Sequence, residues 1–243
     1  MARFLLFVSL ETIYIMKKTL IIALSAIMAL TFTNCKKKDN GPSNTASVMF
    51  VNGCAGATSL QVTANSANVN NATNLSLFGT SGYQNVTATT TENLAFVVPG
   101  INSTLAGGSV SLIVGGHYSA FAGGLSTNGK FVFTTDDLTA PTSGMAKIRL
   151  VNLSPDNLSI ALNLGPTVID SGVASTGYTA FSNVTAGNYK ITVGDNSSSL
   201  TLGSVISLTG QQLSAGKIYT LIYTGTSTGT GTGGYTLTVL TNN

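Results

Sequence analysis

The chain has 243 residues, of which 11 are basic, eight are acidic and one is histidine, and it contains two cysteines and no tryptophan. A single histidine and so few carboxylates leave little material for acid–base catalysis or for a metal site. The hydrophobic content of 43% and the five prolines argue against a disordered or collagen-like chain. We therefore expect a folded protein that is not an enzyme and holds no cofactor.

The start of the chain has the pattern of an export signal. Lys17 and Lys18, directly after Met16, precede an apolar run at 20–32, and a run of about fifteen residues is short for a membrane span. Residues 1–15 form a second apolar stretch, which favours Met16 as the true start of translation. We predict a signal peptide over residues 1–34. The alternative is one long hydrophobic anchor interrupted by the two lysines at its middle.

The apolar run ends at Cys35, which a lysine-rich segment ending in Gly-Pro follows. A cysteine in this position resembles a bacterial lipobox, where the thiol is diacylated and the signal is cut before it. More than one acyl chain, at about 0.8 kcal/mol per buried methylene, anchors a protein stably. We predict a tether over residues 35–44 that is held to the membrane by lipid on Cys35. Because Asn34 and Phe32 depart from the usual motif, an ordinary signal that leaves Cys35 free is the alternative.

The basic character of the chain resides in its first 43 residues. Residues 44–243 hold five basic and six acidic side chains, a net charge of 5 − 6 = −1. Nucleic-acid recognition depends on clustered lysine and arginine, so no nucleic-acid partner is expected. The lysines after Cys35 are read as a solvated spacer, or else as a contact with anionic lipid headgroups.

With Cys35 acylated, Cys54 has no partner for an intramolecular disulfide. We expect Cys54 to be a small buried hydrophobe, and an intermolecular link is the alternative.

Beyond the tether the chain nearly repeats itself. The matched segments are 48–52 with 148–152, 60–64 with 160–164, 82–83 with 177–178, and 118–121 with 219–222. Such steady offsets predict two similar domains, over residues 45–138 and 145–243, joined by a Pro- and Gly-containing linker at 139–144.

Both copies have the pattern of an all-β fold. Residues 159–164, 189–193 and 235–239 alternate apolar and polar side chains, as half-buried strands do. Clusters of Gly, Asn and Ser separate these runs at the spacing typical of a β-sandwich. Residues 224–234 contain only Thr, Ser and Gly, which predicts a long, flexible hairpin loop.

The second copy resembles the domain of unknown function 4397 family. The resemblance lies in residues 146–156, 177–178, 184–191 and 213–221. It implies two tandem immunoglobulin-like β-sandwiches in an exported, Bacteroidetes-type lipoprotein of the outer membrane, on its periplasmic face or at the cell surface. It implies no activity.

The first copy departs from that pattern at two places. Residues 54–56 replace a Ser-Pro-Asp turn, and residues 91–93, with Glu92 in the middle, replace the Ala-Gly-Asn of residues 186–188. The first copy is therefore expected to be the more diverged one.

Four polar positions could carry chemistry. Asp156 lies in a Ser-Pro-Asp turn, where its side chain suits the turn, and His117 follows two glycines and is expected to be exposed. Asp136 and Asp137 are adjacent, and neighbours on a strand point to opposite faces, which disfavours a shared calcium site. We also expect the Tyr189 hydroxyl to hold a strand corner and Gly216 to adopt a positive φ.

Two classes of function remain open. The first is a non-catalytic, tethered envelope module that binds a protein or glycan partner or forms part of an assembly. Within it, a carbohydrate-binding or adhesion protein is one reading, and protein contact through an open strand edge is another. The second class is an enzyme with an unrecognised site, which would have to use His117.

Overall fold

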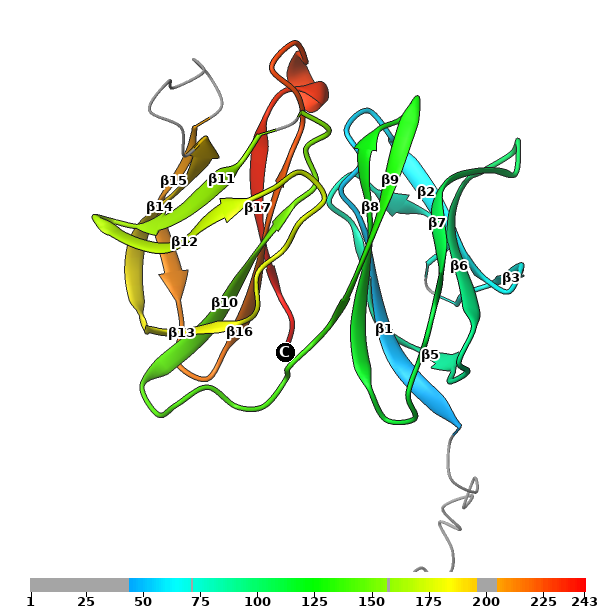
Figure 1. Cartoon of the computed structure of the whole chain (residues 1–243), viewed down its shortest axis with the longest axis horizontal. Helices are drawn as coiled ribbons and strands as arrows, with labels where there is room; N and C mark the ends of the chain where they lie inside the picture. Colours follow the sequence, from blue (N-terminus) through cyan, green and yellow to red (C-terminus); the bar gives the residue numbers. More distant parts are fainter. Residues whose placement is uncertain (1–43, 71, 157, 196–204) are drawn as a thin grey trace, which may run out of the picture. The chain divides into compact units, whose positions relative to one another are not determined.

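The computed structural model describes residues 44–70, 72–156, 158–195 and 205–243. Residues 44–243 form one compact unit. Apart from one 3₁₀ turn at Gly231–Gly233, the regular elements of this part are β-strands. The all-β fold expected from the alternating runs is confirmed, and the strands build two β-sandwiches (Figure 1).

The first sandwich contains strands β1 to β9. They are β1 (Thr45–Asn52), β2 (Ser59–Ala64), β3 (Ala67–Asn68), β4 (Leu75–Ser76), β5 (Thr80–Thr87), β6 (Glu92–Val98), β7 (Ser103–Val110), β8 (His117–Leu125) and β9 (Asn128–Thr135). One sheet has the order β5-β1-β8-β9, and the other has the order β3-β2-β6-β7, with β4 also pairing with β2. The β1–β8 pair is parallel.

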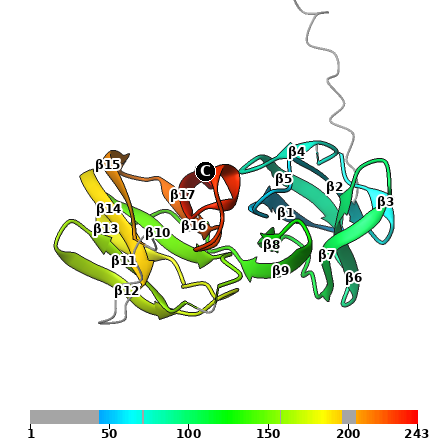
Figure 2. The ribbon, with the colours of Figure 1, turned by 90° about the horizontal axis from the view of Figure 1, so that it is seen from above.

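The second sandwich repeats this plan with strands β10 to β17. They are β10 (Met145–Asn152), β11 (Ile160–Leu164), β12 (Thr167–Val173), β13 (Ser182–Thr185), β14 (Gly187–Asp195), β15 (Ile206–Leu213), β16 (Ile218–Thr224) and β17 (Thr236–Thr241). The sheets have the orders β13-β10-β16-β17 and β12-β11-β14-β15. The β10–β16 pair is parallel, as its counterpart is, and Figure 2 shows the two layers of each sandwich from above.

The hydrogen-bond pattern corrects one of the matches made between the copies. Asn52 N donates to Gly79 O at 3.1 Å, and Asn152 N donates to Gly177 O at 2.9 Å. The equivalent of Gly177 is therefore Gly79, and the match of residues 82–83 with 177–178 is wrong by three positions. The connections before this point differ in length between the copies, so a Gly-Tyr pair is no guide to the register.

A second correction concerns Glu92. Ala64 pairs with Leu94, whereas Leu164 pairs with Ile191. Leu94 is therefore the equivalent of Ile191, and Glu92 is the equivalent of Tyr189. The sequence motif had suggested Gly187 as the equivalent of Glu92, which is wrong.

Each sandwich has a core of its own between its two sheets. In the first, Phe50 of one sheet packs edge-on against Phe96 of the other, with ring centroids 6.2 Å apart. In the second, Leu150 and Leu162 belong to the same buried cluster. Complete burial of such a side chain contributes about 1.5–3 kcal/mol, so these cores supply the main stabilisation of the fold.

A third apolar cluster joins the sandwiches. Met49 and Phe121 of the first sandwich and Val151, Leu153 and Ile222 of the second belong to it. Leu153 is the positional equivalent of Gly53, and a Cβ atom placed on Gly53 would collide with the Leu153 side chain. The missing side chain in the first copy therefore makes room for a leucine of the second.

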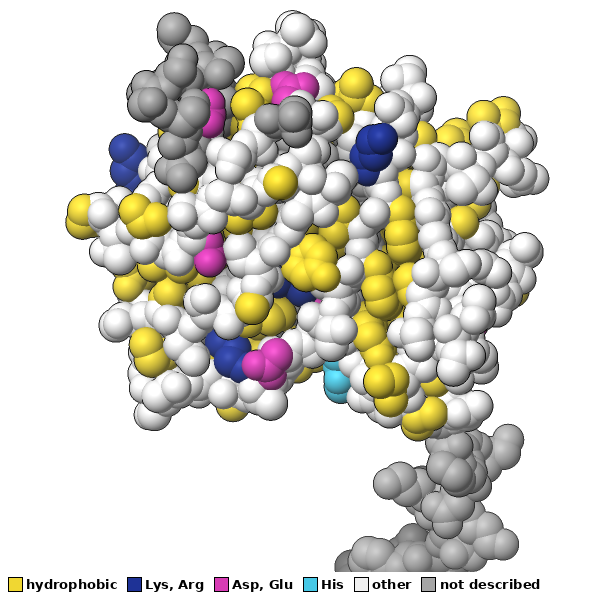
Figure 3. All heavy atoms as spheres, viewed as in Figure 1, with side chains coloured by type: hydrophobic (Ala, Val, Ile, Leu, Met, Phe, Trp, Pro, Cys, Tyr) yellow, Lys and Arg dark blue, Asp and Glu magenta, His cyan; other side chains and the backbone are white. Residues whose placement is uncertain are grey.

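Charged side chains are sparse on the face of residues 44–243 that Figure 3 shows, where apolar and uncharged polar atoms dominate. This agrees with the five basic and six acidic residues of this part of the chain.

Candidate functional site

A groove lies on one side of the first sandwich, between β5 of one sheet and the β2–β3 hairpin of the other. Its volume is about 650 Å³. The two sheet edges diverge here, and amide side chains border the opening. The amides are Asn65, Asn68, Asn70, Gln84 and Asn85.

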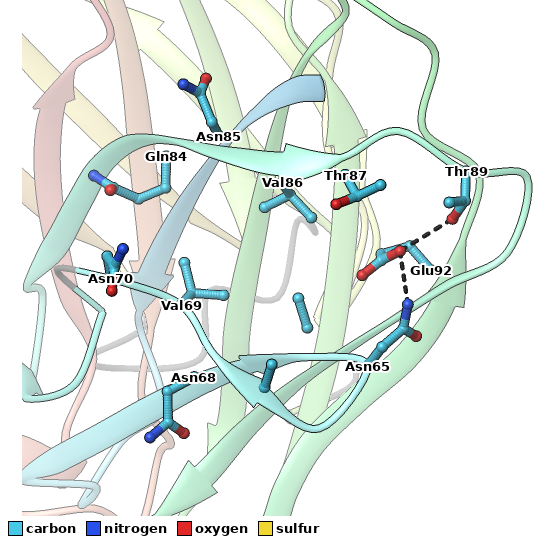
Figure 4. Close-up of a pocket in the computed structure, with 12 residues that line it drawn as sticks. Asn65, Asn68, Val69, Asn70, Gln84, Asn85, Val86, Thr87, Thr89 and Glu92 are labelled. Atoms are coloured by element: carbon cyan, nitrogen blue, oxygen red, sulfur yellow. Dashed lines mark hydrogen bonds between the residues drawn. The ribbon is translucent and has the colours of Figure 1, made fainter. Parts of the chain in front are cut away.

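Figure 4 shows two polar ends and an apolar middle in this groove. Gln84 and Asn70 lie at one end, and Glu92 with Asn65 lies at the other. Between them lie the side chains of two valines, Val69 and Val86, which are 7% and 4% exposed. The groove thus has hydrogen-bonding side chains at both ends and a nearly buried apolar floor between them.

Glu92 is fixed in place at its end of the groove. The residue is 2% exposed, and its Oε2 accepts hydrogen bonds from Asn65 Nδ2 at 2.9 Å and from Thr89 Oγ1 at 3.0 Å. Asn65 is held in turn by Asn93 N, which donates to its Oδ1 at 3.0 Å. Asn65 and Ser66 have φ angles of +46° and +68°, as the two central residues of a tight hairpin do.

The second sandwich has a smaller cavity, of about 280 Å³, at the equivalent position. Larger side chains fill the space there: Leu164 replaces Ala64, Ile169 replaces Val69 and Tyr189 replaces Glu92. The Tyr189 hydroxyl donates to Thr185 O at 2.8 Å, which confirms that this tyrosine holds a corner. The open, polar groove therefore belongs to the first copy.

A buried ion pair lies between the sandwiches. Arg149 Nη1 is 2.7 Å from Asp136 Oδ1, and the two side chains are 1% and 0% exposed. Burial lowers the pKa of Arg149, and the Asp136 carboxylate opposes that effect; an arginine stays protonated in proteins.

Hydroxyl groups and aromatic rings complete the surroundings of this pair. Arg149 donates to Ser119, Thr134 and Thr220. Asp136 Oδ2 accepts from the Tyr83 hydroxyl at 2.6 Å, and the Phe181 ring lies 4.4 Å from Arg149 Cζ. Every polar atom is engaged within the protein, so this arrangement is structural and leaves no group to act on a ligand.

Two other residues named from the sequence, Cys54 and His117, lie within the described part of the chain. Cys54 is buried with a free thiol, as expected, and burial raises its pKa to about 12. His117 is exposed, as expected, and its ring forms a T-shaped pair with the Tyr83 ring, with the two ring centroids 5.8 Å apart. Cys35 lies outside the described residues.

Asp156 and Asp137 have structural partners. Asp156 Oδ2 accepts from Ser227 N at 2.8 Å and from the Tyr235 hydroxyl at 2.5 Å. These bonds fasten the loop of residues 224–234, which is more ordered than a flexible spacer. Asp137 is 2.7 Å from Lys147 Nζ, and because its neighbour Asp136 turns inward, the opposed faces expected for the two aspartates are confirmed.

Across residues 44–70, 72–156, 158–195 and 205–243, no group of three or more His, Cys, Asp and Glu residues could hold a metal ion. In the same part of the chain, no helix has the length and apolar character to cross a bilayer.

Sequence reasoning missed both the groove and the buried ion pair. The exchange of Ala64 for Leu164 in otherwise matching strands was a visible signal for the groove. Arg149, in a strand where the first copy has Met49, was the signal for the ion pair.

Two sandwiches of one topology define a tandem β-sandwich protein. The model of the domain of unknown function (DUF4397) family matches residues 46–163, as the resemblance seen in the sequence implied. The match spans the first sandwich and ends in β11 of the second, so it includes the copy that was expected to be the more diverged.

Comparisons with curated proteins and with solved structures give weaker similarities or none. No curated protein matches the chain significantly. A "putative cell adhesion protein" from Bacteroides uniformis is similar over 83% of this chain and 98% of its own, with 9% identity and a TM-score of 0.26. A leucine-rich repeat protein from Bacteroides thetaiotaomicron is similar over 73% of this chain, with 15% identity and a TM-score of 0.20. The similarity spans 26% of that longer protein. At these scores the likenesses carry no argument about function.

Proposed function

We propose that the protein is a non-catalytic lipoprotein of the cell envelope, anchored to the outer membrane through Cys35, whose first sandwich binds a neutral carbohydrate. The observation that carries the binding role is the contrast between the two equivalent cavities. The first copy keeps about 650 Å³ open and lines it with amides, where the second copy fills the space with Leu164, Ile169 and Tyr189.

The chemistry of the groove favours sugar. A pyranose ring has an apolar face and a rim of hydroxyl groups, each of which donates and accepts hydrogen bonds. The apolar middle of the groove suits the face, because Ala64 and Ala67 line it and are more exposed than the two buried valines. The amides at both ends suit the rim, since each amide is both donor and acceptor. The lining residues include no lysine or arginine, so an anionic ligand has no counter-charge there.

A binding role is favoured over hydrolysis of that sugar. Glycoside hydrolysis uses a pair of carboxylates about 5–9.5 Å apart. Among the described residues that line the groove, Glu92 is the single acid, and its Oε2 is occupied by two donors.

The binding role is tested by calorimetry with neutral oligosaccharides and the purified wild-type protein. The double variant Ala64→Leu/Glu92→Tyr installs the residues of the second copy, and we expect it to abolish binding. Asn70→Ala removes one amide and is expected to weaken affinity about tenfold, the equivalent of one hydrogen bond. The matched control Asn183→Ala removes an amide from the cavity of the second sandwich and is expected to change nothing. Equal affinity in all four proteins would exclude the groove as the site.

The anchor is tested separately. Mass spectrometry of the membrane-bound N-terminal peptide is expected to find acyl chains on Cys35. Treatment of intact cells with a non-penetrating protease then distinguishes a surface protein, which is lost, from a periplasmic one, which is protected. An unmodified Cys35 in a secreted product would overturn the anchor and leave the groove to be judged on its own.

A further inference from the structure

One turn is built in the same way in both sandwiches. In the first, Ile113 N donates to the Tyr118 hydroxyl at 3.0 Å, and Gly115 N donates to Thr45 O at 2.9 Å. The turn starts after a buried leucine, Leu112. Gly115 has a φ of +75°, which glycine adopts without steric cost.

The second sandwich repeats each of these features. Ser214 N donates to the Tyr219 hydroxyl at 3.0 Å, and Gly216 N donates to Met145 O at 2.8 Å. Leu213 is buried, and Gly216 has a φ of +79°, as expected from the sequence. Residues 112–116 and 213–217 are thus equivalent turns.

The two turns differ in the side chains at their tips. The first presents Ile113 and Val114, which are 71% and 53% exposed. The second presents Ser214 and Ala215, which are also exposed. Since the polar tip builds the same turn, the fold does not require the apolar pair, and two adjacent exposed apolar side chains are suited to an apolar contact.

The position of the apolar tip indicates what it touches. Gly115, which follows the two apolar residues, donates to Thr45 O, and Thr45 is the first residue of β1. Asn44, which precedes Thr45, ends the segment that begins at Cys35. The ten residues from Cys35 to Asn44 reach at most roughly 30 Å when fully extended. In Figure 3, apolar side chains gather at the end of the first sandwich where β1 starts in Figure 1.

We propose that Ile113 and Val114 insert into the lipid interface and form a second membrane contact beside the acylated Cys35. This inference rests on the anchor of the proposed function. An acyl chain alone leaves a protein free to rotate on its tether, whereas two apolar side chains in the interface add an attachment that orients the first sandwich. The polar turn of the second sandwich takes no part.

The absence of tryptophan from the chain allows a direct test. Ile113→Trp places a single fluorophore at the tip, and the matched control Ile101→Trp places one at an isoleucine that is 73% exposed in the connection between β6 and β7. Both acylated proteins are reconstituted into phosphatidylethanolamine–phosphatidylglycerol vesicles, with and without brominated acyl chains. Urea unfolding of each variant establishes that it is folded.

For I113W we expect emission to shift to shorter wavelength on vesicles and to lose intensity with brominated lipid, while aqueous iodide quenches it less. For I101W we expect no change from the emission in buffer. An unshifted I113W spectrum in a protein whose Cys35 carries acyl chains would overturn the inference and leave the anchor standing. Equal shifts in both variants would also overturn it, because they would reflect general adhesion to lipid.

Discussion

The two sandwiches share one backbone plan and use it differently. Both keep the tyrosine that accepts a hydrogen bond from its turn, Tyr118 or Tyr219, and both keep the asparagine that ends the first strand, Asn52 or Asn152. That asparagine caps the same loop in each copy, since its Oδ1 accepts from the backbone N two residues on at 3.1 Å. Positions of this kind build the sandwich.

The two copies differ at positions that the shared backbone arrangement does not require. In the first copy Glu92 lines an open groove, whereas its equivalent in the second copy, Tyr189, fills that space. The exposed Ile113 of the first copy is replaced by Ser214 in the second. Arg149 of the second copy replaces Met49 of the first and forms the ion pair with Asp136. The equivalent of Asp136 in the second copy is Asn242, because Asp136 N donates to His117 O and Asn242 N donates to Ile218 O. The differences between the copies therefore locate the features that need an explanation beyond the fold.

The largest effect is expected from Arg149→Met, which installs the residue of the first copy. It leaves the Asp136 carboxylate buried without its cation, and removing one partner of a buried pair costs about 3–5 kcal/mol. Urea denaturation followed by circular dichroism measures the loss in unfolding free energy.

The double variant R149M/D136N is the control for that loss. It exchanges both partners for their equivalents in the other copy and removes the stranded charge. We expect it to recover most of the stability. A double variant as unstable as R149M alone would mean that the lost packing of arginine, and not the unpaired carboxylate, dominates.

Leu164→Ala and Ala64→Leu exchange the groove residues in opposite directions. Leu164 is 4% exposed, so its truncation is expected to cost about 2–5 kcal/mol, the usual range for a buried leucine. Ala64→Leu extends into open space and is expected to cost less than about 1 kcal/mol, since overpacking penalties arise in filled cores. Equal losses in the two variants would contradict an open groove in the first copy.

Gly53→Ala probes the contact between the sandwiches. The added methyl meets Leu153, and overpacking of this kind costs about 1–3 kcal/mol. In a Leu153→Ala background the same change is expected to cost less, with a coupling of about 0.5–3 kcal/mol, as for residues in direct contact. Additive losses in this cycle would show that Gly53 is needed for its backbone and not for the space above it.

Much of the fold could be predicted from the sequence because it depends on local pattern. Alternation of apolar side chains predicted the strand at 159–164, and buried Cys54 and exposed His117 followed from residue type and turn context. The register of Gly82 and Glu92 could not be predicted, because it depends on the lengths of connections that precede each strand.

The residues of the candidate site could not be predicted from the sequence. Asn65 and Asn70 lie in and just after the β2–β3 hairpin, whereas Gln84 lies in β5 of the other sheet. The packing of the two sheets brings them to one groove, which no local pattern encodes. The same holds for Arg149 and Asp136, whose partnership depends on how the sandwiches pack. A charge in an otherwise apolar strand signals that a partner exists without identifying it.

The smallest effect is expected from Asp137→Asn, which again installs the residue of the second copy, Asn243. Hydrogen bonds from Lys147 and Thr139 lower the pKa of Asp137 from 3.8 to about 2. A carboxyl whose pKa is lower in the folded state stabilises the protein above its unfolded pKa and ceases to do so as the pH falls through the folded value. The wild type should therefore exceed D137N in unfolding free energy near neutral pH, and the difference should shrink as the pH falls below about 4 and vanish below about pH 2. Because the Asp137 side chain is 55% exposed, the difference is expected to stay below about 1 kcal/mol and to shrink in high salt. A difference that persisted at pH 2 would show that Asp137 acts through packing and not through its charge.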